Sequence, residues 1–159
     1  AHMKKVIGIG EYAVMKNPGV IVTLGLGSCV AVCMRDPVAK VGAMAHVMLP
    51  DSGGKTDKPG KYADTAVKTL VEELKKMGAK VERLEAKIAG GASMFESKGM
   101  NIGARNVEAV KKHLKDFGIK LLAEDTGGNR ARSVEYNIET GKLLVRKVGG
   151  GEQLEIKEI

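Results

Sequence analysis

Cys29 and His46 are the two residues whose types and spacing could do chemistry. Cys29 follows the glycine-rich stretch Gly25-Leu-Gly-Ser28, and His46 lies in an otherwise apolar run 17 positions later. A thiol becomes a good nucleophile when a neighbouring base takes its proton. A glycine-rich bend can also aim backbone N–H groups at one point, where they would hold the oxyanion of a tetrahedral intermediate. The same two residues fit equally well a buried thiol and a buried, hydrogen-bonded histidine of a hydrophobic core.

The elements that must position this pair are two apolar runs, residues 29–35 and 41–49, joined by a turn that contains Asp36 and Pro37. Both runs are apolar on both faces, which is typical of strands buried from two sides. If the turn is centred near residue 38, Cys29 pairs with about residue 47. We therefore expect His46 to lie opposite Cys29 or diagonal to it, as a thiolate–imidazole pair requires.

Three further residues lie close to Cys29 in the sequence and are candidates for the same site. Thr23, at the end of a β-branched run, could orient the histidine through its hydroxyl or carbonyl, or be an ordinary strand residue. Gly27 and Ser28 are predicted to shape the oxyanion pocket or to contact substrate. Ser28 is not predicted to be a nucleophile itself, because the G-x-S-x-G elbow of serine hydrolases is missing.

Cys33, four residues after Cys29, would face the same side of a strand and raises the question of a metal. A structural zinc site needs four ligands, and the other histidines are His2, near the N-terminus, and His113, on a lysine-rich stretch. We therefore predict no metal and no organic cofactor, and we assign Cys33 to the core.

The apolar periodicity of the whole chain predicts a mixed fold. Helical spacing marks residues 62–77 and 102–117, and shorter β-rich runs alternate with turns through the rest. Hairpins outnumber β-α-β units, which favours an α+β fold, a layered α/β/β-type sandwich with mixed, largely antiparallel sheets. We expect one domain over residues 3–159, with Met3 as the natural start and residues 1–2 as an artificial remnant.

Charge and composition narrow the possible partners. Lys and Arg outnumber Asp and Glu by 26 to 19, a net charge of +7, which suits nucleic acid or an acidic protein surface. The cations are spread along helices and no aromatic stacking platform accompanies them, so we predict no nucleic-acid partner. No apolar run reaches the roughly 18 to 20 residues of a membrane span, and no secretory signal is present. We expect a cytoplasmic protein with two free thiols and no membrane insertion.

Several separated patches together resemble the CheD family, the chemoreceptor glutamine deamidases of bacterial chemotaxis. They follow the family's order over nearly the whole chain and are specific only in combination. One departure is Ala131, where the family pattern would have glycine. The patches are Leu24-Gly-Leu-Gly-Ser-Cys-Val30, Ala45-His-Val-Met-Leu-Pro50, Tyr62-Ala-Asp-Thr-Ala66, Gly90-Gly-Ala-Ser-Met-Phe95, Ile102-Gly-Ala-Arg-Asn106 and Thr126-Gly-Gly-Asn-Arg-Ala-Arg132.

The resemblance implies a protein-glutamine glutaminase with the fold of the CNF-type deamidating toxins. It implies Cys29 as the nucleophile, His46 as the base and Thr23 as the third member. The implied substrates are glutamines on the cytoplasmic helices of chemoreceptors, converted to glutamates through a cysteine thioester, and glutamyl methyl esters could react in the same way. The implied partner is the phosphatase CheC. The alternative is a non-catalytic binding module that regulates receptors and CheC by occupancy, and in either case we expect Met94 and Phe95 to contact a partner.

Overall fold

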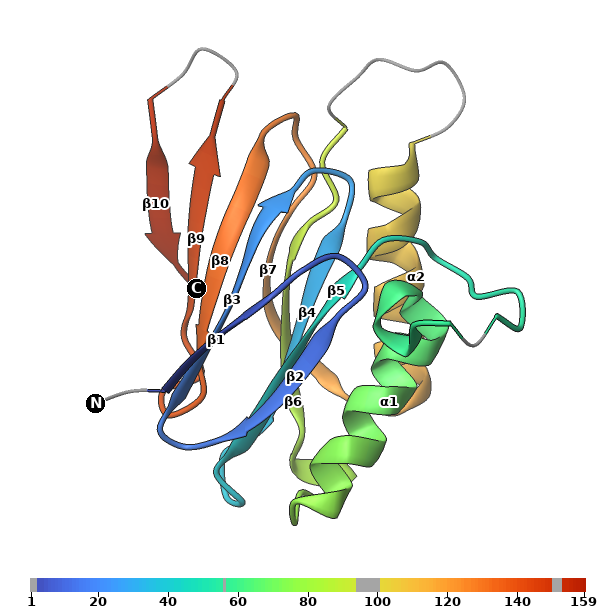
Figure 1. Ribbon diagram of the computed structural model, residues 1–159, viewed down its shortest axis with the longest axis vertical. Helices are drawn as coiled ribbons and strands as arrows, with labels where there is room; N and C mark the ends of the chain where they lie inside the picture. Colours follow the sequence, from blue (N-terminus) through green and yellow to red (C-terminus); the bar gives the residue numbers. More distant parts are fainter. Residues whose placement is uncertain (1–2, 56, 94–100, 150–152) are drawn as a thin grey trace.

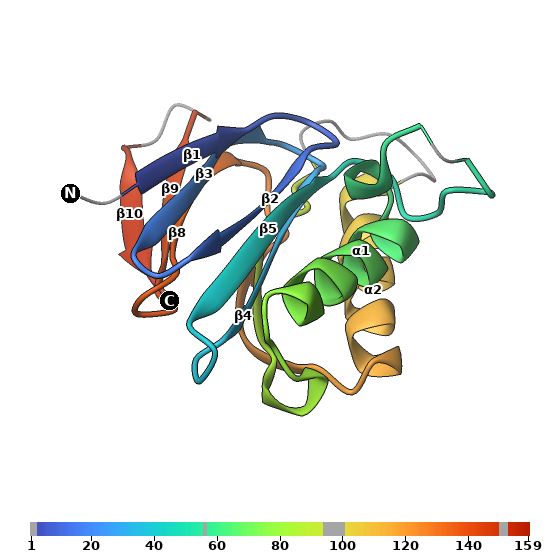
Figure 2. The same cartoon turned by 60° about the horizontal axis from the view of Figure 1, so that its bottom comes forward.

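The computed structural model describes residues 3–55, 57–93, 101–149 and 153–159, and these form three layers. Two five-stranded sheets face each other, and two helices cover the free face of one of them (Figures 1 and 2). The first sheet has the order β1-β3-β8-β9-β10 and the second β2-β5-β4-β6-β7. The elements are β1 (Met3–Ile7), β2 (Tyr12–Lys16), β3 (Gly19–Leu26), β4 (Val30–Asp36), β5 (Val41–Val47), η1 (Pro59–Lys61), α1 (Ala63–Lys76), η2 (Val81–Arg83), β6 (Glu85–Gly90), α2 (Ile102–Asp116), β7 (Lys120–Thr126), β8 (Ala131–Asn137), β9 (Leu143–Val148) and β10 (Glu155–Glu158).

Each sheet contains one parallel pair of strands, and the remaining pairs in the described part of the chain are antiparallel. The parallel pairs are β1 with β3 and β6 with β7. The predicted α+β fold with mixed, largely antiparallel sheets and two helices is therefore confirmed.

The apolar side chains divide between two cores, one on each face of the second sheet. The first core joins this sheet to the helices, where α1 contributes a stripe of buried residues at helical spacing. The second core fills the space between the two sheets. As a result, every residue of β5 is buried and nearly every residue of β4, as the two-sided apolar pattern of this hairpin predicts.

Several boundaries differ from the sequence expectations. The strands β2 and β10 were not expected, because β2 follows a glycine turn directly and β10 is a charged segment with every residue exposed. The β-rich run that follows the first helix also predicts a strand over residues 81–89, but Val81–Arg83 forms a 3-10 turn and the strand begins only at Glu85. Within the described residues, no helix is long and apolar enough to cross a bilayer.

Candidate active site

The hairpin of β4 and β5 places Cys29 and His46 at the same end of the second sheet. Val30 pairs with Val47 and Ala31 with His46, one residue away from the register expected from the sequence. Cys29 directly precedes β4 and lies two positions before Ala31, so it shares the face of Ala31 and His46. Both Cys29 and Ala31 belong to the core between the sheets. His46 is therefore diagonal to Cys29, on the face that looks toward the first sheet.

Thr23 reaches His46 from the opposite sheet. The Thr23 hydroxyl donates to the backbone carbonyl of Ile7 at 2.8 Å, and its Oγ1 lies 2.6 Å from His46 Nδ1. A hydroxyl has a single proton, which is already given to Ile7, so Nδ1 of the imidazole must be the donor to Oγ1. The hydrogen bond therefore selects the tautomer with a proton on Nδ1 and leaves the lone pair on Nε2.

The environment keeps His46 and Cys29 neutral at rest. Both Thr23 and His46 are fully buried, and Cys29 is 8% exposed. Burial lowers the pKa of His46 to about 4, although the negative charge of Glu11 opposes this. Burial raises the pKa of the Cys29 thiol. Nε2 of His46 has no hydrogen-bond partner among the described residues, so its lone pair is free to accept a proton.

A backbone irregularity lies immediately after Thr23. The ladder between β3 and β8 pairs Thr23 with Val134 and then Leu26 with Arg132, so β3 carries one extra residue there. Such a bulge bends a strand and is common beside functional sites. Gly25 sits in this segment with a φ of 68°, a conformation that glycine adopts at little cost. The bulge therefore bends the last part of β3, which still pairs with β8 at Leu26 and lies just before Cys29 in the chain.

Three successive carbonyl groups around Cys29 each accept a hydrogen bond from a part of the chain that is distant in sequence. The carbonyl of Gly27 accepts from Ala92 N–H at 2.8 Å, and that of Cys29 accepts from Gly91 N–H at 2.8 Å. Between them, Asn106 Nδ2 donates to the carbonyl of Ser28 at 3.0 Å. The N–H of Gly27 donates to the carbonyl of Gly25 at 3.1 Å. The N–H groups of Ser28 and Cys29 are therefore better candidates than that of Gly27 for binding an oxyanion.

β6 and the loop after it meet at the Cys29 backbone, and Gly90, the last residue of β6, lies so close to it that it cannot carry a side chain. A Cβ atom there would collide with the Cys29 carbonyl oxygen, and Gly90 has a φ of 116°. Arg132 is 2% exposed and donates to the Gly90 carbonyl at 3.2 Å. Its Nε also donates to Asp125 at 3.0 Å, so an ion pair between the sheets supports the loop.

Sequence reasoning gave no individual role to Asn106, Asp125 or Arg132, although Asn106 and Arg132 each end a patch that resembles the CheD family. A signal for Asn106 was present: it is the polar member of the helical stripe formed by Gly103, Asn106, Val110 and Leu114. The predicted partner contacts Met94 and Phe95 lie outside the described residues. Cys33 is fully buried in the core, and burial raises the pKa of its thiol despite the nearby charge of Lys87.

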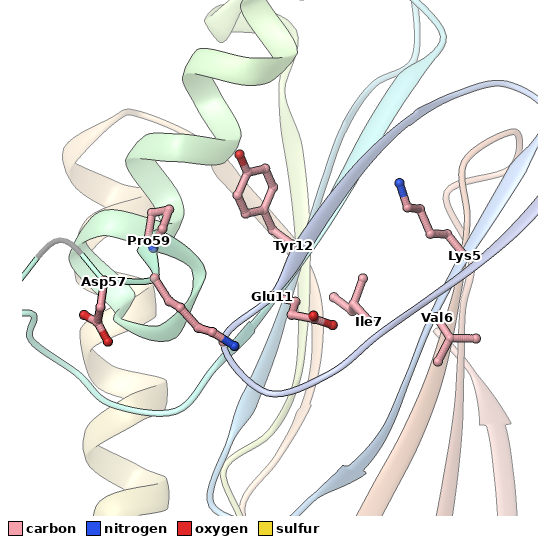
Figure 3. A pocket seen from close by; sticks show the side chains of 9 residues that line it. Lys5, Val6, Ile7, Glu11, Tyr12, Asp57 and Pro59 are labelled. Atoms are coloured by element: carbon pink, nitrogen blue, oxygen red, sulfur yellow. The ribbon is translucent and has the colours of Figure 1, made fainter.

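A pocket of about 430 Å³ lies beside the site, between β1 and the segment around η1 (Figure 3). Two of its lining residues hold the histidine in place. The Ile7 carbonyl accepts from the Thr23 hydroxyl, and the Glu11 carbonyl accepts from the His46 N–H at 3.0 Å. The residues that line it include neither Cys29 nor His46, so it does not reach the thiol. They are Lys5, Val6, Ile7, Gly10, Glu11, Tyr12, Asp57, Lys58 and Pro59.

The fold and the site together define a class: an α+β sandwich that holds a cysteine, a histidine and a threonine at the junction of two sheets. Among solved structures, the Bacillus licheniformis hypothetical protein YfiH shares the fold, with a TM-score of 0.51, 11% identity, and coverage of 75% of this chain and 51% of that one.

Sequence comparison identifies the family within this class. Residues 48–147 match the family described as CheD chemotactic sensory transduction. A protein of Caldanaerobacter subterraneus named "Probable chemoreceptor glutamine deamidase CheD" is 48% identical over 91% of this chain and 93% of its own length. A protein of the same name from Pyrococcus abyssi is 47% identical over 94% of each chain. The chain belongs to the CheD family.

Proposed function

We propose that this chain is a chemoreceptor glutamine deamidase, a cysteine-dependent hydrolase that converts selected receptor glutamines into glutamates. Relatives that bear this name match over more than nine tenths of the chain. The observation that carries the proposal is the hydrogen bond of 2.6 Å between Thr23 and His46. It orients a neutral imidazole with its free lone pair on Nε2, on the same face as a cysteine, which is the arrangement that thiol activation needs.

The first half of the reaction forms an acyl-enzyme. Nε2 of His46 takes the proton of the Cys29 thiol, and the thiolate attacks the carboxamide carbon of the glutamine. The carbonyl oxygen becomes an oxyanion, which the N–H groups of Ser28 and Cys29 stabilise. The C–N bond then breaks, His46 gives its proton to the departing ammonia, and a thioester on Cys29 remains.

The second half uses the same groups in reverse. His46 takes a proton from a water molecule, and the resulting hydroxide attacks the thioester carbon. The C–S bond breaks, the thiolate recovers the proton from His46, and glutamate is released. A glutamyl methyl ester would give the same acyl-enzyme with methanol as leaving group, so methylesterase activity is part of the proposal. The chain's own residues perform every step, and no cofactor is invoked.

The remaining parts of the proposal concern cellular context. The receptors' cytoplasmic helices are the substrate, the enzyme acts in the cytoplasm, and CheC is a protein partner. The net charge of +7 suits an acidic helical surface. The domain extends over residues 3–159, and we propose kinship of its fold with the CNF-type deamidating toxins.

Mass spectrometry of receptor fragments tests the activity. Wild-type protein should produce the mass gain of an amide-to-acid conversion and release ammonia, whereas Cys29→Ala should do neither while still binding the fragments. Cys33→Ala is the matched control, because it removes the other, fully buried thiol and should retain activity. Deamidation by Cys29→Ala would refute the mechanism. Binding without deamidation by the wild type would instead establish a module that acts by occupancy.

A further inference from the structure

Asn106 joins the two chain segments that carry the candidate nucleophile and base. It lies on α2, is fully buried, and its Nδ2 donates to the carbonyls of Ser28 and Met48, each at 3.0 Å. Ser28 directly precedes Cys29, and Met48 follows His46 by two residues. Both protons of the amide nitrogen are therefore used on the active-site hairpin. The N-terminal end of α2 is itself held by Asn101, whose side chain accepts from Ala104 N–H at 3.0 Å.

The cost of burying the Asn106 amide indicates that position 106 needs a side chain with two N–H donors. Oδ1 of Asn106 is buried and has no hydrogen-bond partner among the described residues. A buried acceptor without a partner costs free energy, and an apolar side chain in this stripe would avoid that cost. The opposite amide orientation would set Oδ1 against two carbonyl oxygens, so the hydrogen-bond network itself assigns Nδ2 to them.

The bond to Ser28 fixes the direction of one particular N–H group. In a trans peptide group the carbonyl and the N–H of the next residue lie in one plane and point in opposite directions. Holding the Ser28 carbonyl toward α2 therefore turns the Cys29 N–H away from the helix. The adjacent peptide planes are held by the backbone N–H groups of Ala92 and Gly91, whereas in the described part of the chain this plane is held by the Asn106 side chain.

We propose that Asn106 is a positioning residue that locks the Ser28–Cys29 peptide so that the Cys29 N–H faces the oxyanion of each tetrahedral intermediate. This inference rests on the proposed function, since an oxyanion forms only if Cys29 attacks a carbonyl carbon. Asn106 touches no reacting atom; it acts through the backbone of the nucleophile. Its second hydrogen bond, to the Met48 carbonyl, fixes the position of the segment after β5 relative to the same peptide.

Two reagents separate this role from a general effect on the fold. Iodoacetamide alkylates the Cys29 thiolate by displacing iodide from a saturated carbon, so no oxyanion forms. p-Nitrophenyl acetate acylates the same sulfur through a tetrahedral oxyanion, after which the C–O bond breaks and p-nitrophenolate leaves. Both rates are measured in the full chain carrying Cys33→Ala, so that Cys29 is the one thiol present.

In this background, Asn106→Ala should lower the acylation rate by about 10²- to 10³-fold, as for loss of an oxyanion donor. Alkylation should change less than threefold. The loss of deamidation should fall on kcat and leave KM for the receptor fragment unchanged. Val110→Ala is the matched control: it truncates the next buried residue of the same stripe and should leave the ratio of the two rates unchanged. If Asn106→Ala does not fold, Asn106→Ser takes the same assay, with a fall in acylation again expected without one in alkylation.

An equal fall of both rates would show that Asn106 is merely structural, and unchanged rates would show that the peptide holds its direction without it. Either result overturns the inference. Failure of the proposed function has a different signature, because wild-type protein would then release no ammonia from receptor fragments.

Discussion

His46 and Asp125 are both buried polar residues that join the two sheets, but the surroundings of His46 favour its neutral form and those of Asp125 favour its charged form. His46 on β5 meets one neutral hydroxyl across the gap, that of Thr23 on β3. Asp125 on β7 meets three cations from the other sheet: Arg132 at 3.0 Å, Lys147 at 3.3 Å and Lys157 at 2.8 Å. Burial favours the neutral form of His46, and it would also raise the pKa of Asp125. The ion pair with Lys157 and the charges of Arg132 and Lys147 outweigh burial, so the pKa of Asp125 is lowered.

The contrast distinguishes a structural brace from a reactive centre. A buried charge is tolerated when opposite charges and hydrogen bonds replace its water, as they do around Asp125. His46 lacks such compensation, and its Nε2 is left without a partner among the described residues. A proton accepted there creates a positive charge that is stabilised by Thr23, by the thiolate and by the negative charge of Glu11. The comparison therefore predicts separate effects of mutation and pH on the two regions.

The largest effect on stability is expected from Asp125→Ala. It removes the counter-charge of the buried Arg132, and breaking such a buried pair costs about 3 to 5 kcal/mol. Urea unfolding monitored by circular dichroism measures the loss. Asp116→Ala removes the partner of Lys112 in an exposed ion pair and should cost less than about 1 kcal/mol. Equal losses in the two variants would mean that the brace does not depend on burial.

The pH dependence of stability should show the two regions in separate windows. The unfolded His46 has a pKa near 6.5 and the folded one a pKa of about 4, so between these values only the unfolded chain binds the proton. Stability should therefore fall as the pH drops from about 6.5 to about 4, by at most about 3 kcal/mol. Asp125 contributes stability above its ordinary pKa of 3.8, which is lost as the pH falls further, through its lowered folded value.

Unfolding curves at a series of pH values measure both windows. His46→Gln should abolish the His46 part of the fall between pH 6.5 and 4 and leave the acid window in place, while Asp125→Asn should do the reverse. A His46→Gln variant with the unchanged pH profile would show that His46 binds a proton equally well in the folded and the unfolded chain.

A smaller effect is expected from Thr23→Val, which removes the hydroxyl beside Nδ1. During catalysis His46 becomes an imidazolium, so the bond to Oγ1 becomes charge-assisted and is worth about 1.5 to 3 kcal/mol. Loss of it should lower kcat for deamidation by about 10- to 100-fold. Thr23→Ser keeps the hydroxyl and should keep most of the activity. If Thr23→Val is as active as the wild type, the hydrogen bond does not set the tautomer that the reaction uses.

Local pattern predicted much of this fold, because strong periodicity marks buried elements. The hairpin that carries Cys29 and His46 is apolar on both faces and was placed within one residue of its register. The segments β2 and β10 carry no such signal, and backbone pairing with β5 and β9 determines them.

The supports of the site could not be predicted in the same way. Thr23 was named as a candidate from its place near Cys29, but its contact with His46 crosses between sheets. Asn106 bonds Ser28 over 78 positions, and Arg132 bonds the Gly90 carbonyl over 42. Contacts between residues so far apart in the sequence leave no periodic pattern in it, because they depend on how the layers of the fold pack.

The wide separation of these supports has a consequence for synthesis of the protein on the ribosome. A nascent chain that ends soon after β5 already contains Thr23, Cys29 and His46, but it lacks Asn106, Arg132 and the strand β8 that pairs with β3. These later segments cannot make their contacts before they have been synthesised. The thiol therefore acquires its surroundings only when nearly the whole polypeptide has emerged. A chain truncated after β5 would carry Thr23, Cys29 and His46 without the contacts that Asn106 and Arg132 supply.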